Sequence, residues 1–330
     1  MSTVVHGTDV NISRTFSSGL GIIIPCFNEE EVIPKLLAEL DGFAATVPYL
    51  VYVLFIDDGS RDRTYEMLRK ACADDSHKAC LRFSRNFGHQ TAVTAGLAHI
   101  RGDVIGVIDA DLQDPLAALG QMVEQWKAGF DVVYGVRRNR KEGAVLRFCY
   151  SAFYRILKKM ANIDIPLDSG DFCIMDRRVV DVINAMPEHS RFIRGLRGWV
   201  GFEQIGFEYD RSARAAGQTK YNFSRLMKLA FDGIVSFSTV PLRLASLLGL
   251  IAGTFGLLYL LYAIVVKIVD PTAPIGWAST IAVIVFFGGV QLIVLGIIGE
   301  YLGRVFEESK GRPLYIVEQR DGWLNESKSS

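Results

Sequence analysis

Two long uncharged segments near the C-terminal end constrain this chain more than any other feature. Leu244 to Val266 is a run of 23 residues without a charged side chain, and Ile275 to Ile298 is a run of 24 whose most polar side chain is Gln291. A helix needs about 20 apolar residues to cross the hydrocarbon core of a bilayer. We therefore predict two transmembrane helices, at about residues 244–266 and 275–298. A buried helical hairpin of a soluble protein is the alternative, but core helices usually have shorter apolar runs.

The residues that flank these segments predict their orientation. The connection from Lys267 to Pro274 is short and contains two prolines, which favours a tight antiparallel hairpin. Basic side chains stand before the first segment and after the second, at Arg225, Lys228, Arg243, Arg304, Lys310 and Arg312. The positive-inside rule places both flanks in the cytoplasm. We expect a multi-pass protein of the cell inner (plasma) membrane, with both termini cytoplasmic and a cytoplasmic tail over residues 300–330.

The rest of the composition narrows the compartment and the partners. Met1 to Ser18 is polar and has no apolar core of the signal-peptide kind, so we expect a flexible arm followed by a domain that stays in the cytosol. The five cysteines form no C-x-x-C pair, which fits a reducing compartment and implies no structural zinc. A formal net charge of zero argues against nucleic acid as a partner.

Short apolar runs alternate with helical patterns in the N-terminal part of the chain. Strands are predicted at Gly21–Pro25, Val51–Ile56, Ala79–Ser84 and Val104–Ile108, and helices at Glu31–Leu40, Thr64–Cys72, Thr91–Ile100 and Leu116–Trp126. This alternation predicts an α/β fold with a mostly parallel sheet covered on both faces. In such sheets, ligands bind beyond the carboxyl ends of the strands.

A pair of aspartates follows the fourth predicted strand. Asp109 and Asp111 are two residues apart, and side chains at that spacing in an extended segment point the same way. Two carboxylates that face one ligand suit a hard divalent cation carrying a nucleotide diphosphate. A strand end with two solvated aspartates is the alternative.

Two earlier polar clusters also follow predicted strands. Asp57-Asp58-Gly59-Ser60 can accept hydrogen bonds from a base or a ribose, but these residue types also cap turns and helices. Pro25 to Glu30 opens the first helix, which Asn28 can cap instead of binding a ligand. The chain has no G-x-G-x-x-G after the first strand and no Walker A loop, which argues against a nicotinamide dehydrogenase and the common NTPases. We interpret His89 and His99 as structural, because their spacing does not predict a metal pair.

Five ordered motifs together resemble a known family. They are Pro25-Cys-Phe-Asn28-Glu29-Glu30, Asp57-Asp58-Gly59-Ser60, Asp109-Ala-Asp111-Leu-Gln113-Asp114-Pro115, Asp168-Ser-Gly-Asp171-Phe172 and Arg214-Ala-Ala-Gly217-Gln-Thr219-Lys220-Tyr221. Over about residues 19–312 the chain resembles the family 2 glycosyltransferases, and within them the polyprenyl-phosphate glycosyltransferases, such as bactoprenol glucosyltransferases and dolichol-phosphate mannose synthase. The resemblance implies a GT-A (Rossmann-like) fold, an inverting transfer from a nucleotide sugar, and Mg2+ or Mn2+ at the D-x-D motif.

The resemblance also implies roles for individual residues. Asp57 would contact the base, Arg214 and Lys220 would clamp the donor phosphates, and the complete nucleotide-sugar set would be Pro25, Asn28, Glu30, Asp57, Asp58, Asp109, Gln113, Arg214 and Lys220. The metal would be held by Asp109, Asp111 and Gln113. The acceptor phosphate would be bound by Arg137, Arg147 and Ser151, and the catalytic residues would be Asp171 and Arg137.

A phosphate acceptor changes what Asp171 has to do. A phosphate monoester carries a charge of about −1.5 to −2 at pH 7, so its oxygen is already a nucleophile. Asp171 then orients a sugar hydroxyl or an arginine, or takes a proton only from the singly protonated acceptor. Arginines suit two anionic substrates, and eight basic residues lie between Arg137 and Lys159. Attraction of this run to anionic lipid headgroups is the alternative.

The predicted organisation keeps the site close to a bilayer. We expect an arm over residues 1–18, a GT-A catalytic domain over 19–220, interfacial amphipathic helices over 221–241 and the two spans within 242–299. Arg194 to Trp199 is similar to the Q-x-x-R-W motif of processive family members but lacks the Gln, which favours transfer of one sugar.

The predicted reaction moves one sugar, with glucose from UDP-glucose as the leading choice, to undecaprenyl or another polyprenyl phosphate at the cytoplasmic face. The alternatives are mannose, N-acetylglucosamine or a 4-amino-arabinose derivative as the sugar, and a glycerolipid hydroxyl as the acceptor, which would make Asp171 an obligatory base. An alternative of another class is a non-catalytic nucleotide-sugar-binding membrane tether. Expected partners are a downstream flippase and a transferase that uses the lipid-linked sugar, and the glycines between Gly288 and Gly299 allow a homo-oligomer.

Overall fold

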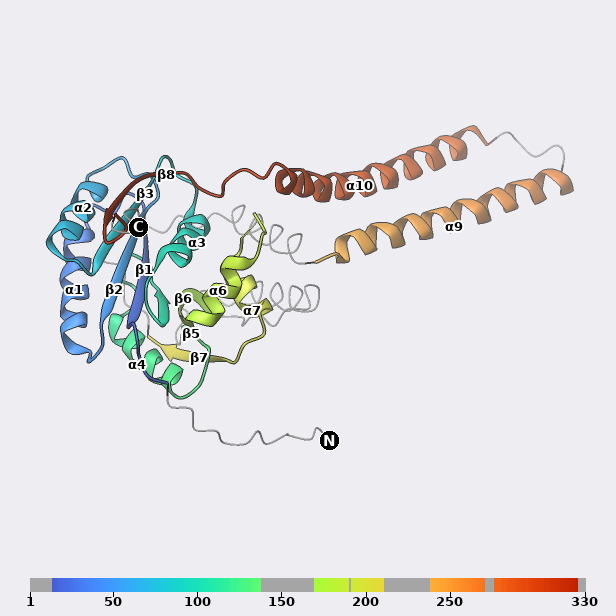
Figure 1. The fold of residues 1–330 in the computed structure, drawn as a ribbon. Helices are drawn as coiled ribbons and strands as arrows, with labels where there is room; N and C mark the ends of the chain where they lie inside the picture. Colours follow the sequence, from blue (N-terminus) through green and yellow to red (C-terminus); the bar gives the residue numbers. More distant parts are fainter. Residues whose placement is uncertain (1–13, 138–168, 190, 211–237, 271–275, 326–330) are drawn as a thin grey trace, which may run out of the picture. The chain divides into compact units, whose positions relative to one another are not determined.

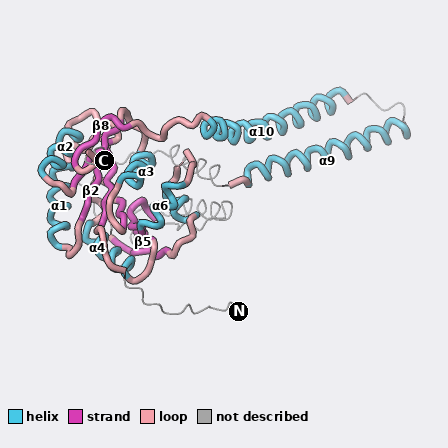
Figure 2. Tube along the Cα trace, viewed as in Figure 1, coloured by secondary structure: helices cyan, strands magenta, loops and turns pink. Residues whose placement is uncertain are grey.

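The computed structural model describes residues 14–137, 169–189, 191–210, 238–270 and 276–325. The described residues fall into two compact units. The first unit is a sheet domain, which contains the residues before 211 and those from Arg312 onward, and the second contains two long apolar helices. Figure 1 shows both as ribbons, and Figure 2 shows the helices and strands of each by colour.

The sheet domain is built on eight strands among the described residues, in the order β7-β5-β6-β4-β1-β2-β3-β8. Their bounds are β1 Leu20–Cys26, β2 Val51–Asp57, β3 Lys78–Phe83, β4 Val104–Val107, β5 Val132–Arg137, β6 Ser169–Asp176, β7 Gln204–Tyr209 and β8 Val317–Gly322. Strand β1 pairs in parallel with β2 and β4, β2 with β3, and β5 with β7, whereas β6 and β8 run antiparallel to their neighbours. The predicted mostly parallel sheet is confirmed.

Helices cover both faces of this sheet, as the continuous apolar strands predict (Figure 1). One face carries α1 Ile33–Thr46, α2 Thr64–Asp74 and α4 Leu116–Lys127, whose buried side chains form one core with β1 and β2. The other face carries α3 His89–His99, α6 Arg177–Ala185 and α7 Ile193–Trp199. Helix α3 lies so close to β1 that a Cβ added at Gly96 would be 2.2 Å from Ile23.

The end of the predicted N-terminal arm is anchored to this domain. Arg14 donates to the carbonyl of Gly129 at 2.7 Å and to Asp131 at 2.8 Å. The carboxylate of Asp103 accepts the backbone N–H groups of residues 17–19 at 2.5 to 3.0 Å. Arg14 and residues 17–19 are thus held against the sheet domain, and the first 13 residues of the arm lie outside the described part of the chain.

The C-terminal tail returns to the sheet. Residues after the second long helix form β8, which pairs antiparallel with β3 from Ala79↔Gly322 to Phe83↔Val317. The sequence of β8, VEQRDG, has no apolar alternation, and sequence reasoning assigned no element to it. Strand β3 is thereby an interior strand instead of an edge strand.

The second unit contains α9 Val240–Val269 and α10 Trp277–Ser309. Both contain a stretch of 18 residues that is apolar enough to cross a membrane, with mean hydropathy 2.1 within Val240–Val266 and 2.8 within Ser279–Ser309. Only 6% of the first stretch and none of the second is buried by the described residues, unlike the core helix of a soluble protein. The helices contact each other where Gly256 faces the ring of Phe287. The predicted amphipathic helices over 221–241 lie almost wholly outside the described residues.

Candidate functional site

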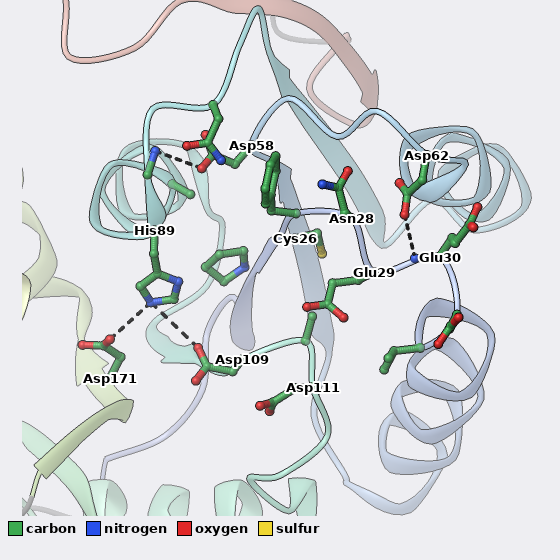
Figure 3. Close-up of a pocket in the computed structure, with 18 residues that line it drawn as sticks. Cys26, Asn28, Glu29, Glu30, Asp58, Asp62, His89, Asp109, Asp111 and Asp171 are labelled. Carbon is green, nitrogen blue, oxygen red and sulfur yellow. Dashed lines mark hydrogen bonds and ion pairs between the residues drawn. The ribbon is translucent and has the colours of Figure 1, made fainter. Parts of the chain in front are cut away.

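A cavity of about 890 Å³ lies at the carboxyl ends of β1, β2 and β4. Its lining is strongly acidic, with eight carboxylates, from Glu29, Glu30, Glu31, Asp58, Asp62, Asp109, Asp111 and Asp171. His89 is the one basic side chain among the described residues that line it (Figure 3). Residues from four of the five motifs therefore lie in this one cavity, at the edge of the sheet where ligands of parallel sheets bind.

The loop after β1 is fastened to the loop after β2. The backbone N–H of Asn28 donates to the hydroxyl of Ser60 at 3.0 Å, and the side-chain oxygen of Asn28 accepts from the N–H of Arg61 at 2.9 Å. Asn28 has a φ of 55°, a left-handed conformation that asparagine tolerates better than most residues.

The side chains of this loop face the cavity and do not cap the first helix. Pro25, Asn28 and Glu30, three of the predicted nucleotide-sugar ligands, line the cavity. Helix α1 begins at Ile33, and its N-cap, Val32, makes no side-chain cap. The alternative in which Asn28 caps this helix is therefore not what the structure shows.

The two aspartates after β2 lie in different places. Asp58 lines the cavity, and its carboxylate accepts the N–H groups of Phe87 at 2.7 Å and Gly88 at 2.9 Å. Asp57 is fully buried and is not part of the lining. Burial raises the pKa of both carboxyl groups. The structure therefore places Asp58 in the lining of the cavity and buries Asp57 outside that lining, and the contact of Asp57 with a base stays a prediction.

The D-x-D motif presents two carboxylates to the cavity. Asp109 and Asp111 both line it, two and four residues past the end of β4 (Figure 3). Gln113 is only 9% exposed, lies outside the lining, and donates its backbone N–H to Asp111 at 3.2 Å. Its backbone thus supports the turn at Asp111, and the predicted role of Gln113 as a metal ligand stays a prediction.

The donor set at this motif suits a hard divalent cation. Burial, together with the negative charges of Asp171, Asp114 and Asp111, raises the pKa of Asp109, whereas His89 opposes that rise. A cation would relieve this repulsion, and carboxylate oxygens are ligands that Mg2+ and Mn2+ accept. No group of three or more His, Cys, Asp or Glu side chains within the described residues is arranged to hold a metal. Substrate phosphate oxygens and water are further ligands that such a cation accepts.

Asp171 is held by several donors at once. Arg194 donates to its two oxygens at 2.6 and 3.0 Å, and the side-chain amide of Gln90 lies 3.3 Å from one of them. His89 approaches the same oxygen at 3.2 Å. Burial would raise the pKa of Asp171, but the hydrogen bond from His89 and the charge of Arg194 hold it well below its usual range. Asp171 is therefore ionised and firmly bound by its neighbours, which makes it a weak base.

His89 belongs to the site, contrary to the structural role that its spacing from His99 indicated. Its Nε2 lies 3.2 Å from Asp171 and 3.8 Å from Asp109, so the ring stands between these two carboxylates (Figure 3). Burial lowers the pKa of His89, but the hydrogen bond to Asp171 and the two negative charges raise it overall. The strand-end rule could have found His89, because it follows β3 as the motif aspartates follow β2 and β4. His99 instead contacts the hydroxyl of Tyr315 at 3.1 Å.

Arg137 lies at the end of β5, beside the acidic cavity but not in its lining. Burial lowers its pKa, but a hydrogen bond to the hydroxyl of Tyr209 and the charge of Asp114 raise it overall. The Tyr209 hydroxyl in turn donates to Asp114 at 2.5 Å. The other predicted phosphate ligands, Arg147, Ser151, Arg214 and Lys220, lie outside the described residues.

Two family models match this chain. The model "Glycosyl transferase family 2" matches residues 21–183, and "GtrB C-terminal hairpin" matches residues 240–305. An uncharacterized glycosyltransferase of Bacillus subtilis is 44% identical over 92% of this chain and 94% of its own length. A bactoprenol glucosyl transferase of Shigella phage SfX is 39% identical over 91% of this chain and 99% of its own length. Among solved structures, a mannosyltransferase of Pyrobaculum calidifontis aligns over 89% of this chain and 90% of its own, with 14% identity and a TM-score of 0.44.

Proposed function

Because the chain belongs to the family 2 glycosyltransferases, we propose that it transfers a single sugar from a nucleotide sugar to a polyprenyl phosphate at a membrane surface. The observation that carries the proposal is the combination of an acidic, metal-suited cavity with two candidate membrane spans in one chain. A transferase with a soluble acceptor would need no such spans. UDP-glucose is the leading donor and undecaprenyl phosphate the leading acceptor, in line with the relatives named for glucosyl transfer to bactoprenol.

A divalent metal, Mg2+ or Mn2+, would be held by Asp109 and Asp111. When bound, it neutralises the diphosphate of the donor and stabilises that diphosphate as a leaving group. Held there, the cation would offset the negative charge of the other acidic side chains of the cavity, which would otherwise repel a nucleotide diphosphate.

Asp171 acts in this proposal as a positioning residue and not as a base. Its oxygens are already occupied by Arg194, His89 and Gln90. The acceptor phosphate is a nucleophile without losing a proton, since its second pKa is about 6. Asp171 therefore fixes the His89 ring and the Arg194 guanidinium at the edge of the cavity. A glycerolipid hydroxyl would need a base, and this pairing argues against that acceptor.

The acceptor phosphate would bind beside the acidic cavity and not inside it. Arg137 is the last residue of β5 and the first of the basic run that ends at Lys159. A guanidinium binds phosphate oxygens through two parallel hydrogen bonds. Arg147 and Ser151 belong to the same proposed acceptor site, and Arg214 and Lys220 are proposed to contact the donor phosphates.

The chain connectivity supports a defined topology. Residues on both sides of the α9–α10 pair belong to the same sheet domain, because β8 follows α10 and pairs with β3. Both ends of the pair must therefore lie on one side of any membrane that it crosses twice. The basic flanks indicate that this side is the cytoplasm. The lipid-linked sugar would then require a flippase and a downstream transferase.

The test is sugar transfer by the full-length protein in detergent, with a panel of labelled UDP- and GDP-sugars, undecaprenyl phosphate, and Mn2+ or Mg2+. We expect lipid-linked product from one donor, lost on chelation and in Asp111→Asn. Tight metal-dependent nucleotide binding without product from any donor would contradict the proposal and favour the non-catalytic tether.

A further inference from the structure

Asp57 is buried beneath the cavity but is linked to it through one residue. Its Oδ1 accepts the backbone N–H of Ser60 at 3.3 Å, and the Ser60 hydroxyl also bonds to the Asp57 carboxylate. The same hydroxyl oxygen accepts the N–H of Asn28 at 3.0 Å. A hydroxyl that donates to Asp57 keeps its lone pairs for Asn28. An ionised Asp57 therefore holds the Asn28 loop that lines the cavity.

Arg82 is the cation that faces this buried carboxylate. Its Nε lies 3.5 Å from Oδ2 of Asp57 and 3.3 Å from Oε2 of Glu318. Oδ2 of Asp57 and Nε of Arg82 are buried and make no hydrogen bond within the described part of the chain, so charge attraction is what holds Arg82 between Asp57 and Glu318. A buried carboxylate without a paired cation is strongly disfavoured.

The C-terminal strand holds Arg82 in this position. Glu318 belongs to β8, and the guanidinium also lies over the ring of Tyr65 at 4.5 Å. The Tyr65 hydroxyl bonds to Gln319 and, at 2.6 Å, to Asp321. Three groups therefore surround Arg82. Glu318 belongs to β8, Tyr65 is bonded to β8, and Asp57 is the third.

We propose that Arg82, held by β8, is a positioning residue for nucleotide-sugar binding that acts through Asp57 and Ser60 on the cavity loop at Asn28. This inference rests on the proposed function, because it takes the cavity to be the donor site. Without the Arg82 charge, Asp57 loses the cation that favours its ionised form. Burial already raises the pKa of Asp57, and a protonated Asp57 no longer accepts from Ser60 as a carboxylate does. The loop at Asn28 then loses its anchor, and the donor binds more weakly.

The experiment measures the affinity of the full-length protein for UDP and for GDP, each with Mn2+, by titration calorimetry in detergent. For the nucleotide that the wild type binds, Arg82→Gln should weaken binding about tenfold, the size expected for loss of one charged partner, and Arg82→Lys should recover part of it. Arg69→Gln is the matched control, since Arg69 contacts Asp321 of β8 at 3.9 Å but not Asp57. We expect it to leave the affinity unchanged.

A second variant separates positioning from general stability. In an Asp57→Asn background, Arg82→Gln should cause no further loss of affinity, because the route through Asp57 is already broken. Equal losses with and without Asp57 would overturn the proposal. Glu318→Gln alters an exposed side chain and should weaken binding two- to threefold, so an unchanged affinity there would also count against it even if Arg82→Gln fails to fold.

The outcomes also distinguish this inference from the proposed function. If the wild type binds a nucleotide but Arg82→Gln binds it equally well, only the inference about Arg82 fails. If the wild type binds neither nucleotide with Mn2+, the donor site itself is wrong and both proposals fail.

Discussion

Replacement of Asp171 by Asn removes a cavity carboxylate that Arg194, His89 and Gln90 contact together. In the wild type this side chain is 11% exposed, and Arg194 donates to it at 2.6 and 3.0 Å. Asn keeps one acceptor oxygen but cannot form the paired bonds to the guanidinium. Breaking a buried ion pair from one side costs about 3 to 5 kcal/mol, and the 28% exposure of Arg194 favours the lower value, about 3 kcal/mol. For a domain of this size the melting temperature should fall by roughly 6 to 12 °C.

The stability difference should depend on pH in a defined direction. The pKa of Asp171 is held below its usual range in the folded protein, so its contribution is present above the unfolded value of about 3.9 and is lost as pH falls below that. Thermal scans of wild type and Asp171→Asn should therefore differ most above about pH 5, and the difference should shrink steadily as pH falls below about 3.9. Asp181→Asn is the control, because Asp181 is 63% exposed and makes one ion pair at 4.0 Å.

The same variant tests whether Asp171 is a base. Displaced His89 and Arg194 side chains should reduce kcat roughly a hundredfold, the usual cost of a misplacement near 1 Å. The acidic limb of the rate profile should stay near pH 6, about the second pKa of the acceptor phosphate, in both proteins. Loss of that limb in Asp171→Asn, or an unchanged melting temperature, would refute the positioning role.

Three further predictions follow from other parts of the molecule. Gly96→Ala should destabilise the protein by about 1 to 3 kcal/mol in denaturant unfolding, because its Cβ would lie 2.2 Å from Ile23. Gly120→Ala, where the nearest atom would be 3.5 Å away, should not, and equal costs would contradict the packing argument. Asp103→Asn should cost about 1.5 kcal/mol at pH 7, by loss of the charged acceptor for residues 17–19. Since those contacts lower the pKa of Asp103, this difference should shrink as pH falls below about 3.9, and a constant difference would contradict it. Chelation of Mn2+ should weaken nucleotide binding at least tenfold in calorimetry, whereas equal affinity with and without metal would contradict a metal at Asp109 and Asp111.

Local patterns in the sequence were enough to predict the strands and helices next to the site. The apolar runs of β1 to β4 are continuous because both faces are covered, and each ends in polar residues at the same edge of the sheet. The α9 and α10 helices followed from length and apolar character alone. These features depend on residues that are neighbours in the chain.

Features that depend on distant residues could not be predicted. Asp57 and Asp58 are adjacent, chemically identical and both buried, and only the packing of Arg82 and of the Phe87–Gly88 turn decides which one lines the cavity. Strand β8 is polar and forms by backbone pairing with β3, more than 200 residues away in the sequence. The ionised state of Asp171 depends on Arg194 and His89, which come from two separate helices.

The most direct test of the central claim is the mass of the lipid product formed by the purified protein from its donor, undecaprenyl phosphate and Mn2+. We predict a single species, heavier than undecaprenyl phosphate by one sugar residue and retaining one phosphate, which is absent in Asp111→Asn. A product that carries several sugars or a second phosphate, or a lipid that stays unmodified while the protein binds the nucleotide sugar, would contradict the account.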